Sequence, residues 1–229
     1  MYRLYAMSSP NVVKVTLLLE ELEQDYDLQW VNVFGGEQHE DWFRALNPNG
    51  KVPVLAEPRT GGDFALFESG AIMQWLADKH GAFGGATPDE QALVRQWLTF
   101  QMAGAGPTFG QAIHFTHVTT ECPYGGRRFT IEMRRQLAVI EKRLAEVPFL
   151  AGEYSIADMA LWPWIRTLAM FFADDLKTPS LRRWYETVGA RDGVVRAAER
   201  MQPLQEQDGA ARKAASTADI DRYFGRIAP

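Results

Sequence analysis

Strand-like and helix-like patterns alternate through the first 80 residues of the chain. Short apolar runs predict strands at 2–7, 28–33, 51–55 and 63–67. Apolar residues at helical spacing predict helices at 10–22 and 37–46 and from residue 69 onward. Glycine- and asparagine-rich turns separate these elements. The resulting order, β-α-β-α-β-β-α, predicts an α/β domain.

Strand patterns stop after the glycine-rich stretch at 81–87, and the rest of the chain predicts helices. The clearest of these helices are expected at 127–144, 156–172, 179–188 and 194–202. Ser155 and Asp158 form a capping box with a structural role at the start of the helix at 156, which is apolar nearly all round and therefore buried. We predict a first domain at 1–81, a linker at 82–88 and an all-α domain at 89–229, with a weakly packed or extended tail from about 205.

Polar residues gather at the start of the first helix. Ser9 is the expected N-cap, and Pro10 takes the favoured first helical position. Unpaired N–H groups and a partial positive charge at such a helix start stabilise an anion. Ser8, Ser9 and Asn11 would surround it with donors. An anion site and ordinary capping explain this stretch equally well.

Two further positions suggest a place for a peptide-like ligand. Pro53 interrupts the apolar strand at 51–55, which requires an edge, a bulge or a cis bond. We favour a cis bond, which would leave the backbone of Val52 open to a peptide. Ser69 is the expected N-cap of the third helix and makes a second helix start suited to an anion.

Composition and charge exclude several classes of function. The net charge of −5 and the sequence pI near 5.5 argue against a nucleic-acid binder and against an anionic membrane surface. The sequence shows neither a membrane-spanning run nor a signal-peptide pattern, so we expect a cytoplasmic protein. The single cysteine, Cys122, excludes an internal disulfide, a Cys-x-x-Cys pair and a cysteine-rich zinc site. Thiol chemistry must use a ligand's thiol or Cys122 itself.

Three motifs together resemble the cytosolic glutathione transferases: NPNGKVPV at 47–54, FESGAI at 67–72 and YSIAD at 154–158. Within that family, SPN at 9–11 and ALWPW at 160–164 look most like the bacterial Nu-class glutathione-dependent disulfide-bond oxidoreductases, which typically carry threonine where Ser9 stands. The resemblance implies a thioredoxin-like N-terminal domain, a helical-bundle C-terminal domain, glutathione as cosubstrate without a metal, and a homodimer. Sedimentation as a single 25.8 kDa species would contradict the homodimer.

The resemblance also implies roles for individual residues. Ser9 and Asn11 would face the sulfur, and Glu68 and Ser69 would hold the γ-glutamyl end. Val52, ahead of cis Pro53, would pair with the cysteinyl unit. Gln38 and Lys51 would reach the glycine carboxylate or the peptide, and Arg128 would add a positive charge.

The donors at the start of the first helix indicate how the thiol of glutathione could be activated. Hydroxyl and amide donors stabilise a thiolate more than a thiol, and a thiolate attacks a disulfide sulfur or an electrophilic carbon. The Nu-class likeness favours disulfide reduction. The alternatives are a transferase that conjugates glutathione to electrophilic small molecules and a non-catalytic glutathione-binding regulatory module.

Three other groups of residues have a structural interpretation. Tyr5 is expected to pack within its strand. Cys122 lies far in sequence from the start of the first helix and is not expected to act as a nucleophile. His114 and His117 lack a third metal ligand.

Overall fold

The computed structural model describes residues 1–119 and 121–228. Its contacts group the chain into two compact units, residues 1–73 together with those from 193 onward, and residues 74–192. The last helices therefore belong with the first sheet, a grouping that local sequence patterns do not contain. The predicted domain limits at 81 and 89 stay a prediction.

The first unit begins with the predicted order of strands and helices. Its elements are β1 (Tyr2–Ala6), α1 (Pro10–Glu21), β2 (Tyr26–Trp30), the 3-10 turn η1 (Glu37–His39), α2 (Asp41–Leu46), β3 (Val54–Glu57), β4 (Phe64–Phe67) and α3 (Ser69–His80), whose last turns enter the second unit. The prediction of a single helix over 37–46 was wrong in detail, because a 3-10 turn and a short α-helix share this stretch.

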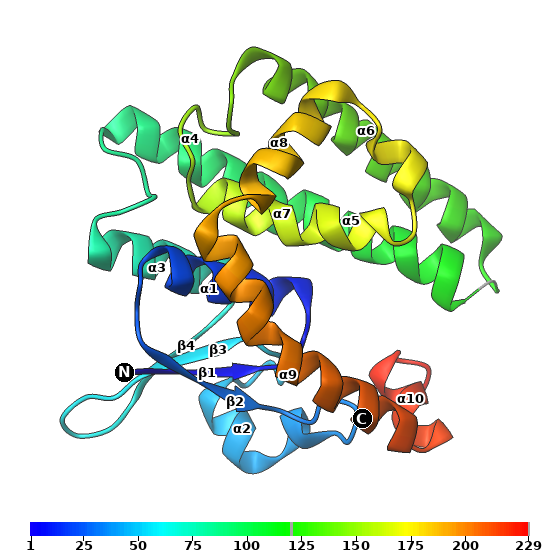
Figure 1. Cartoon of the computed structure of the whole chain (residues 1–229). Coiled ribbons are helices and arrows are strands. Elements are labelled where there is room, and N and C mark those ends of the chain that lie inside the picture. The colour runs from blue at the N-terminus through cyan, green and yellow to red at the C-terminus, as the bar shows by residue number, and fades with distance from the viewer. Residues whose placement is uncertain (120, 229) are drawn as a thin grey trace. The chain divides into compact units, whose positions relative to one another are not determined.

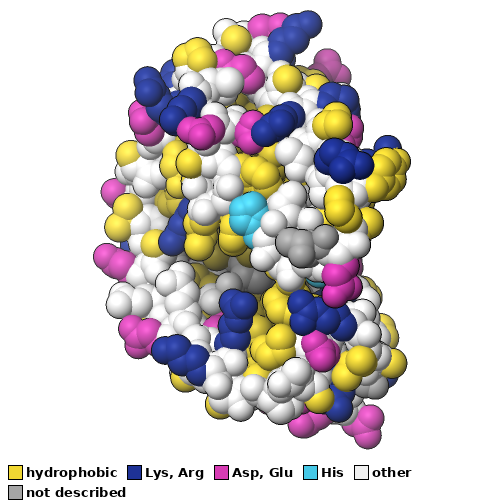
Figure 2. Space-filling model, turned by 90° about the vertical axis from the view of Figure 1, so that its right-hand side faces the viewer, with side chains coloured by type: hydrophobic (Ala, Val, Ile, Leu, Met, Phe, Trp, Pro, Cys, Tyr) yellow, Lys and Arg dark blue, Asp and Glu magenta, His cyan; other side chains and the backbone are white. Residues whose placement is uncertain are grey.

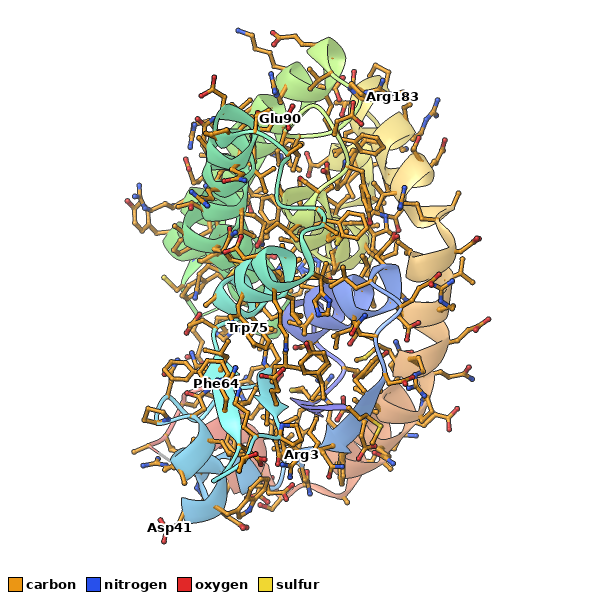
Figure 3. The ribbon with its side chains drawn as sticks, turned by 90° about the vertical axis from the view of Figure 1, so that its left-hand side faces the viewer. Arg3, Asp41, Phe64, Trp75, Glu90 and Arg183 are labelled. Atoms are coloured by element: carbon orange, nitrogen blue, oxygen red, sulfur yellow. The ribbon has the colours of Figure 1, made fainter. Side chains whose placement is uncertain are left out.

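The four strands form one mixed sheet in the order β2-β1-β3-β4 (Figure 1). β1 runs parallel to β2 and antiparallel to β3, with Leu4 opposite both Leu28 and Leu55. β4 closes the sheet as the antiparallel partner of β3, and Arg3 of β1 forms an ion pair with Asp63, just before Phe64 of β4 (Figure 3). Because β3 is antiparallel to β1, the sheet places the end of β1 and the start of β3 near the turn that leads into α1.

Alternation along β1 explains which face is buried. Leu4 and Ala6 are fully buried, whereas Arg3 and Tyr5 are partly exposed. Tyr5 packs against Trp42 and Phe43 of α2, with ring centroids 6.0 and 6.4 Å away. The packing role predicted for Tyr5 agrees with these contacts.

The regular elements in the described part of the second unit are helices, joined by loops, one of which carries isolated β-bridges at 149–153. Its elements are α4 (Pro88–Thr99), the π-helical turn η2 (Phe100–Ala105), α5 (Gly106–Ile113), the π-helical turn η3 (His114–Val118), α6 (Pro123–Glu146), α7 (Ile156–Ala169), the 3-10 turn η4 (Ala173–Leu176) and α8 (Pro179–Gly189). The Thr87 hydroxyl caps α4 by accepting from the Glu90 N–H, and Glu90 is visible at that end of the helix (Figure 3). Arg183 of α8 donates to the Leu144 carbonyl at 2.6 Å and so ties α8 to the end of α6 (Figure 3).

The capping box that begins α7 is present as predicted. The Ser155 hydroxyl accepts from the Ala157 N–H, and the Ser155 N–H donates to Asp158 at 3.1 Å. Asp158 is fully buried and also accepts from the Leu150 N–H and the Trp184 indole N–H, at 2.9 and 2.8 Å. This carboxylate therefore joins the start of α7 to a preceding loop and to α8.

The C-terminal tail differs from the expectation of weak packing. α9 (Asp192–Ala214) continues through Pro203 where we predicted an end near 202, and α10 (Thr217–Tyr223) follows it. Pro203 removes one helical N–H donor, but Met201 and Leu204 on either side of it are buried and hold the helix together. The tail packs because Met201 and Leu204 are buried and Asp208 accepts hydrogen bonds from Ser8 and Trp30.

Candidate functional site

The turn between β1 and α1 has the predicted geometry. Ser9 is the N-cap, and its hydroxyl oxygen accepts from the Val12 N–H at 3.4 Å. Its carbonyl accepts from the Val12 and Val13 N–H groups, both at 3.0 Å. Since the hydroxyl oxygen serves as acceptor, its proton can still be donated to a ligand at the positive end of α1.

Ser8 is held differently from Ser9. Its N–H and its hydroxyl donate to the same oxygen of Asp208, at 2.6 and 2.5 Å. The other Asp208 oxygen accepts from the Trp30 indole N–H at 2.9 Å. Asp208 is 6% exposed, so a buried carboxylate from α9 fixes the backbone immediately before the N-cap.

A pocket of about 380 Å³ opens beside this turn. Four predicted site residues line it: Ser9, Gln38, Lys51 and Val52. The other lining residues are Met7, Val33, His39, Gly50, Arg222 and Tyr223. The structure thus brings together the start of α1, the η1 turn and the loop before β3, which lie far apart in the sequence.

The loop before β3 carries the predicted cis bond, between Val52 and Pro53. β3 begins at Val54, so Pro53 lies just before the strand and not inside it. The buried Asn47 fixes this loop, because its amide donates to the Lys51 carbonyl at 2.6 Å and its oxygen accepts from the Asn49 N–H at 2.9 Å. The backbone of Val52 is thereby set at the wall of the pocket.

Gln38 contributes a buried acceptor to the same pocket. The residue is 7% exposed, and its amide nitrogen lies 3.1 Å from the His39 ring. Its amide oxygen has no hydrogen-bond partner among the described residues. A buried carbonyl oxygen without a donor is costly, so this atom suits an N–H supplied by a ligand.

The start of α3 differs from the prediction by one residue. Ser69, 3% exposed, is the first residue of the helix, and Glu68 precedes it with a positive φ of 67°. The Glu68 carbonyl accepts from the Ile72 N–H at 2.9 Å, as a cap residue does. A left-handed backbone is uncommon outside glycine, and residues held that way cluster at functional sites.

Lys14 lies beside Glu68 although the sequence analysis did not select it. It is 1% exposed on α1, among the apolar residues that form the buried face of the helix. Burial lowers the pKa of Lys14 to about 7, and the negative charge of Glu68 opposes this shift. In the sequence, Lys14 is a charged residue within the apolar pattern at 12–19, and this interruption could have marked it as a candidate.

The low pKa of Lys14 predicts how stability changes with pH. Between pH 7 and about 10.5 the unfolded chain holds a proton that the folded chain has lost, so the free energy of unfolding rises with pH, by at most about 1.4 kcal/mol per pH unit. Replacing Lys14 with methionine removes this rise. Urea unfolding at pH 7 to 10 checks it, with the exposed Lys142→Met as control. Parallel profiles for wild type and Lys14→Met would contradict the assignment.

The remaining candidates lie in the second unit. Arg128 is exposed on α6, and its predicted role stays a prediction. Cys122 is exposed just before α6. The His117 ring packs against Phe171 and Phe172, and no group of three potential metal ligands occurs among the described residues. The cavity of about 550 Å³ in this unit lies beside the capping box of α7.

Sequence reasoning missed Asp208, Arg222 and Tyr223. Asp208 lies 200 residues from Ser8, and Arg222 and Tyr223 lie at least 170 residues from the other residues that line the pocket, in a tail whose composition carries no helix-packing signal. Side chains of both charges are interspersed on the face shown in Figure 2.

Comparisons with known proteins agree on one family. The family models for the N-terminal and C-terminal domains of glutathione S-transferase match residues 8–79 and 123–187. The disulfide-bond oxidoreductases YfcG and YghU of Escherichia coli K12 are 40% and 36% identical to the chain. The alignments cover 86% and 85% of this chain and 94% and 73% of those proteins.

A solved structure supports the same conclusion. A glutathione transferase from Pseudomonas putida, with one glutathione disulfide bound per subunit, superposes with a TM-score of 0.81 at 34% identity. The superposition covers 86% of this chain and 90% of that one. No helix in the described part of the chain is long and apolar enough to cross a membrane.

Proposed function

Because the chain belongs to the glutathione S-transferase family, we propose that it is a glutathione-dependent thiol–disulfide oxidoreductase. The observation that carries the proposal is the pocket in which Ser9, Gln38, Lys51 and Val52 meet beside the start of α1. The names of YfcG and YghU and the glutathione disulfide bound to the P. putida protein support the choice of reaction. A symmetric homodimer and a cytoplasmic location remain predictions.

The pocket supplies a group for each part of the cysteinyl–glycine half of glutathione. We assign two donors to the sulfur at the positive end of α1, Ser9 from the pocket wall and Asn11 from the first turn of the helix, and these donors stabilise the thiolate over the thiol. Val52 pairs with the cysteinyl backbone, and the buried Gln38 oxygen accepts the peptide N–H. Lys51 faces the glycine carboxylate.

The γ-glutamyl end is assigned to the start of α3. The N–H groups there receive the α-carboxylate, and Ser69 adds its hydroxyl. Glu68, with its left-handed backbone, takes the ammonium group. Arg128 is assigned a supporting positive charge.

The reaction proceeds by two thiol–disulfide exchanges. A glutathione thiolate attacks one sulfur of the substrate disulfide, forms a mixed disulfide and releases the other sulfur as a thiolate, which takes up a proton. A second glutathione thiolate attacks the glutathione sulfur of the mixed disulfide and releases the remaining substrate thiolate. Two glutathiones are oxidised to glutathione disulfide while the substrate disulfide is reduced to two thiols.

The test is glutathione-dependent reduction of a small dialkyl disulfide, coupled to glutathione reductase and NADPH. We expect turnover by the wild type and a fall in kcat of about tenfold in both Ser9→Ala and Asn11→Ala, since each loses one of two donors to a charged sulfur. Thr187→Ala, which deletes an exposed hydroxyl on α8, is the control. Glutathione binding without disulfide turnover would overturn the proposal, in favour of conjugation to electrophiles or of a regulatory module.

A further inference from the structure

The C-terminal helices α9 and α10 belong to the first unit, pack along its N-terminal elements and end at the pocket. Arg196 and Arg200 of α9 form ion pairs with Glu20 of α1, at 3.1 and 3.6 Å. Asp208, two turns further along, binds Ser8 and Trp30. α9 therefore lies along β2 and carries α10 to the same side of the unit as the start of α1 (Figure 1).

α10 is held at the pocket by its own contacts. The Ser216 hydroxyl and Asp219 form a capping box that begins the helix. At its other end the Tyr223 ring packs against Phe34, with centroids 4.6 Å apart, and Phe34 is 7% exposed. Since Val33, the neighbour of Phe34, also lines the pocket, this ring contact fixes Arg222 and Tyr223 as part of the wall.

Arg222 brings a second cation to a pocket that already contains Lys51. One of its terminal nitrogens donates to Asp219 at 2.8 Å, and a guanidinium has five N–H donors in all. The side chain is 45% exposed, so its charge remains accessible to a ligand. Lys51 and Arg222 share this pocket with the buried Gln38 oxygen, which has no donor among the described residues. These three groups suit the end of a peptide, where a carboxylate follows an N–H. A guanidinium can bind both oxygens of that carboxylate.

We propose that Arg222 of α10 binds the glycine carboxylate of glutathione and makes the pocket selective for thiol tripeptides whose terminal carboxylate is free. This inference rests on the proposed function, because it takes glutathione as the ligand of the pocket. α10 lies outside the regions that the two family models match, so the contact belongs to this chain's own tail. Tyr223 positions Arg222 through Phe34.

The test compares glutathione with its C-terminal amide, which keeps the thiol and the peptide but lacks the carboxylate charge. Calorimetric titration of the full chain measures the dissociation constant of each. We expect the wild type to bind glutathione at least about tenfold more tightly than the amide. Arg222→Ala should weaken glutathione binding about tenfold and leave the amide unchanged, and Arg222→Lys should recover part of the loss.

Arg226→Ala, three residues beyond the end of α10, is the matched control, because it removes a cation from the same tail outside the pocket lining. Equal weakening of glutathione and amide in Arg222→Ala would overturn the inference, as would a wild type that does not distinguish them. Because binding is measured directly, loss of disulfide turnover with glutathione selectivity intact would reject the proposed reaction alone. A wild type that does not bind glutathione would reject both.

Discussion

Replacing Asp158 with alanine is expected to lower the free energy of unfolding by about 4 kcal/mol, which corresponds to a fall in Tm of about 10 °C. The carboxylate is fully buried and accepts the backbone N–H groups of Leu150 and Ser155 and the indole N–H of Trp184. Alanine would leave these donors buried without partners, and each such donor costs about 1–3 kcal/mol. The capping box of α7 would be lost at the same time.

Urea unfolding and calorimetry measure this change. Asp174→Ala is the matched control, because that carboxylate is 93% exposed and its ion pair with Lys177 spans only three residues. We expect the control to change stability by less than about 0.5 kcal/mol. A loss below about 1 kcal/mol in Asp158→Ala would show that the buried donors find other partners.

Replacing Asp208 with alanine is expected to lower kcat for disulfide reduction about 100-fold while the KM for glutathione changes only a few-fold. Asp208 holds the Ser8 N–H and hydroxyl at 2.6 and 2.5 Å, and Ser9 follows directly. Releasing Ser8 lets the start of α1 move relative to the sulfur, and a displacement of about 1 Å costs rates of this order. Glutathione still binds through Lys51, Val52 and the start of α3.

The readout that separates positioning from folding is the thiol pKa of bound glutathione, followed by ultraviolet absorbance of the thiolate. We expect this pKa to rise towards that of free glutathione in Asp208→Ala, because the donors no longer face the sulfur. Glu206→Ala, an exposed carboxylate on the same helix, is the control. A folded Asp208→Ala protein with wild-type kcat and an unchanged thiol pKa would show that Asp208 only attaches α9.

The sequence by itself determined the features that depend on close neighbours along the chain. The N-cap at Ser9, the capping box of Ser155 and Asp158 and the order of strands and helices in the first unit follow from spacings of a few residues. The cis bond before Pro53 is equally local, since the cis form is accessible almost only to the peptide bond that precedes a proline. These interactions form between groups that the chain itself keeps adjacent.

Only the tertiary structure decided which distant residues complete the site. Asp208 reaches Ser8 across 200 residues, and Arg222 and Tyr223 reach the pocket only because α9 continues past Pro203. Burial of Lys14 beside Glu68 depends on how α1 and the start of α3 pack. Local propensity predicts that the helix breaks at Pro203 and that the chain beyond it packs weakly. Burial outweighs this propensity: Met201 and Leu204 are removed from water, and Asp208 receives hydrogen-bond donors.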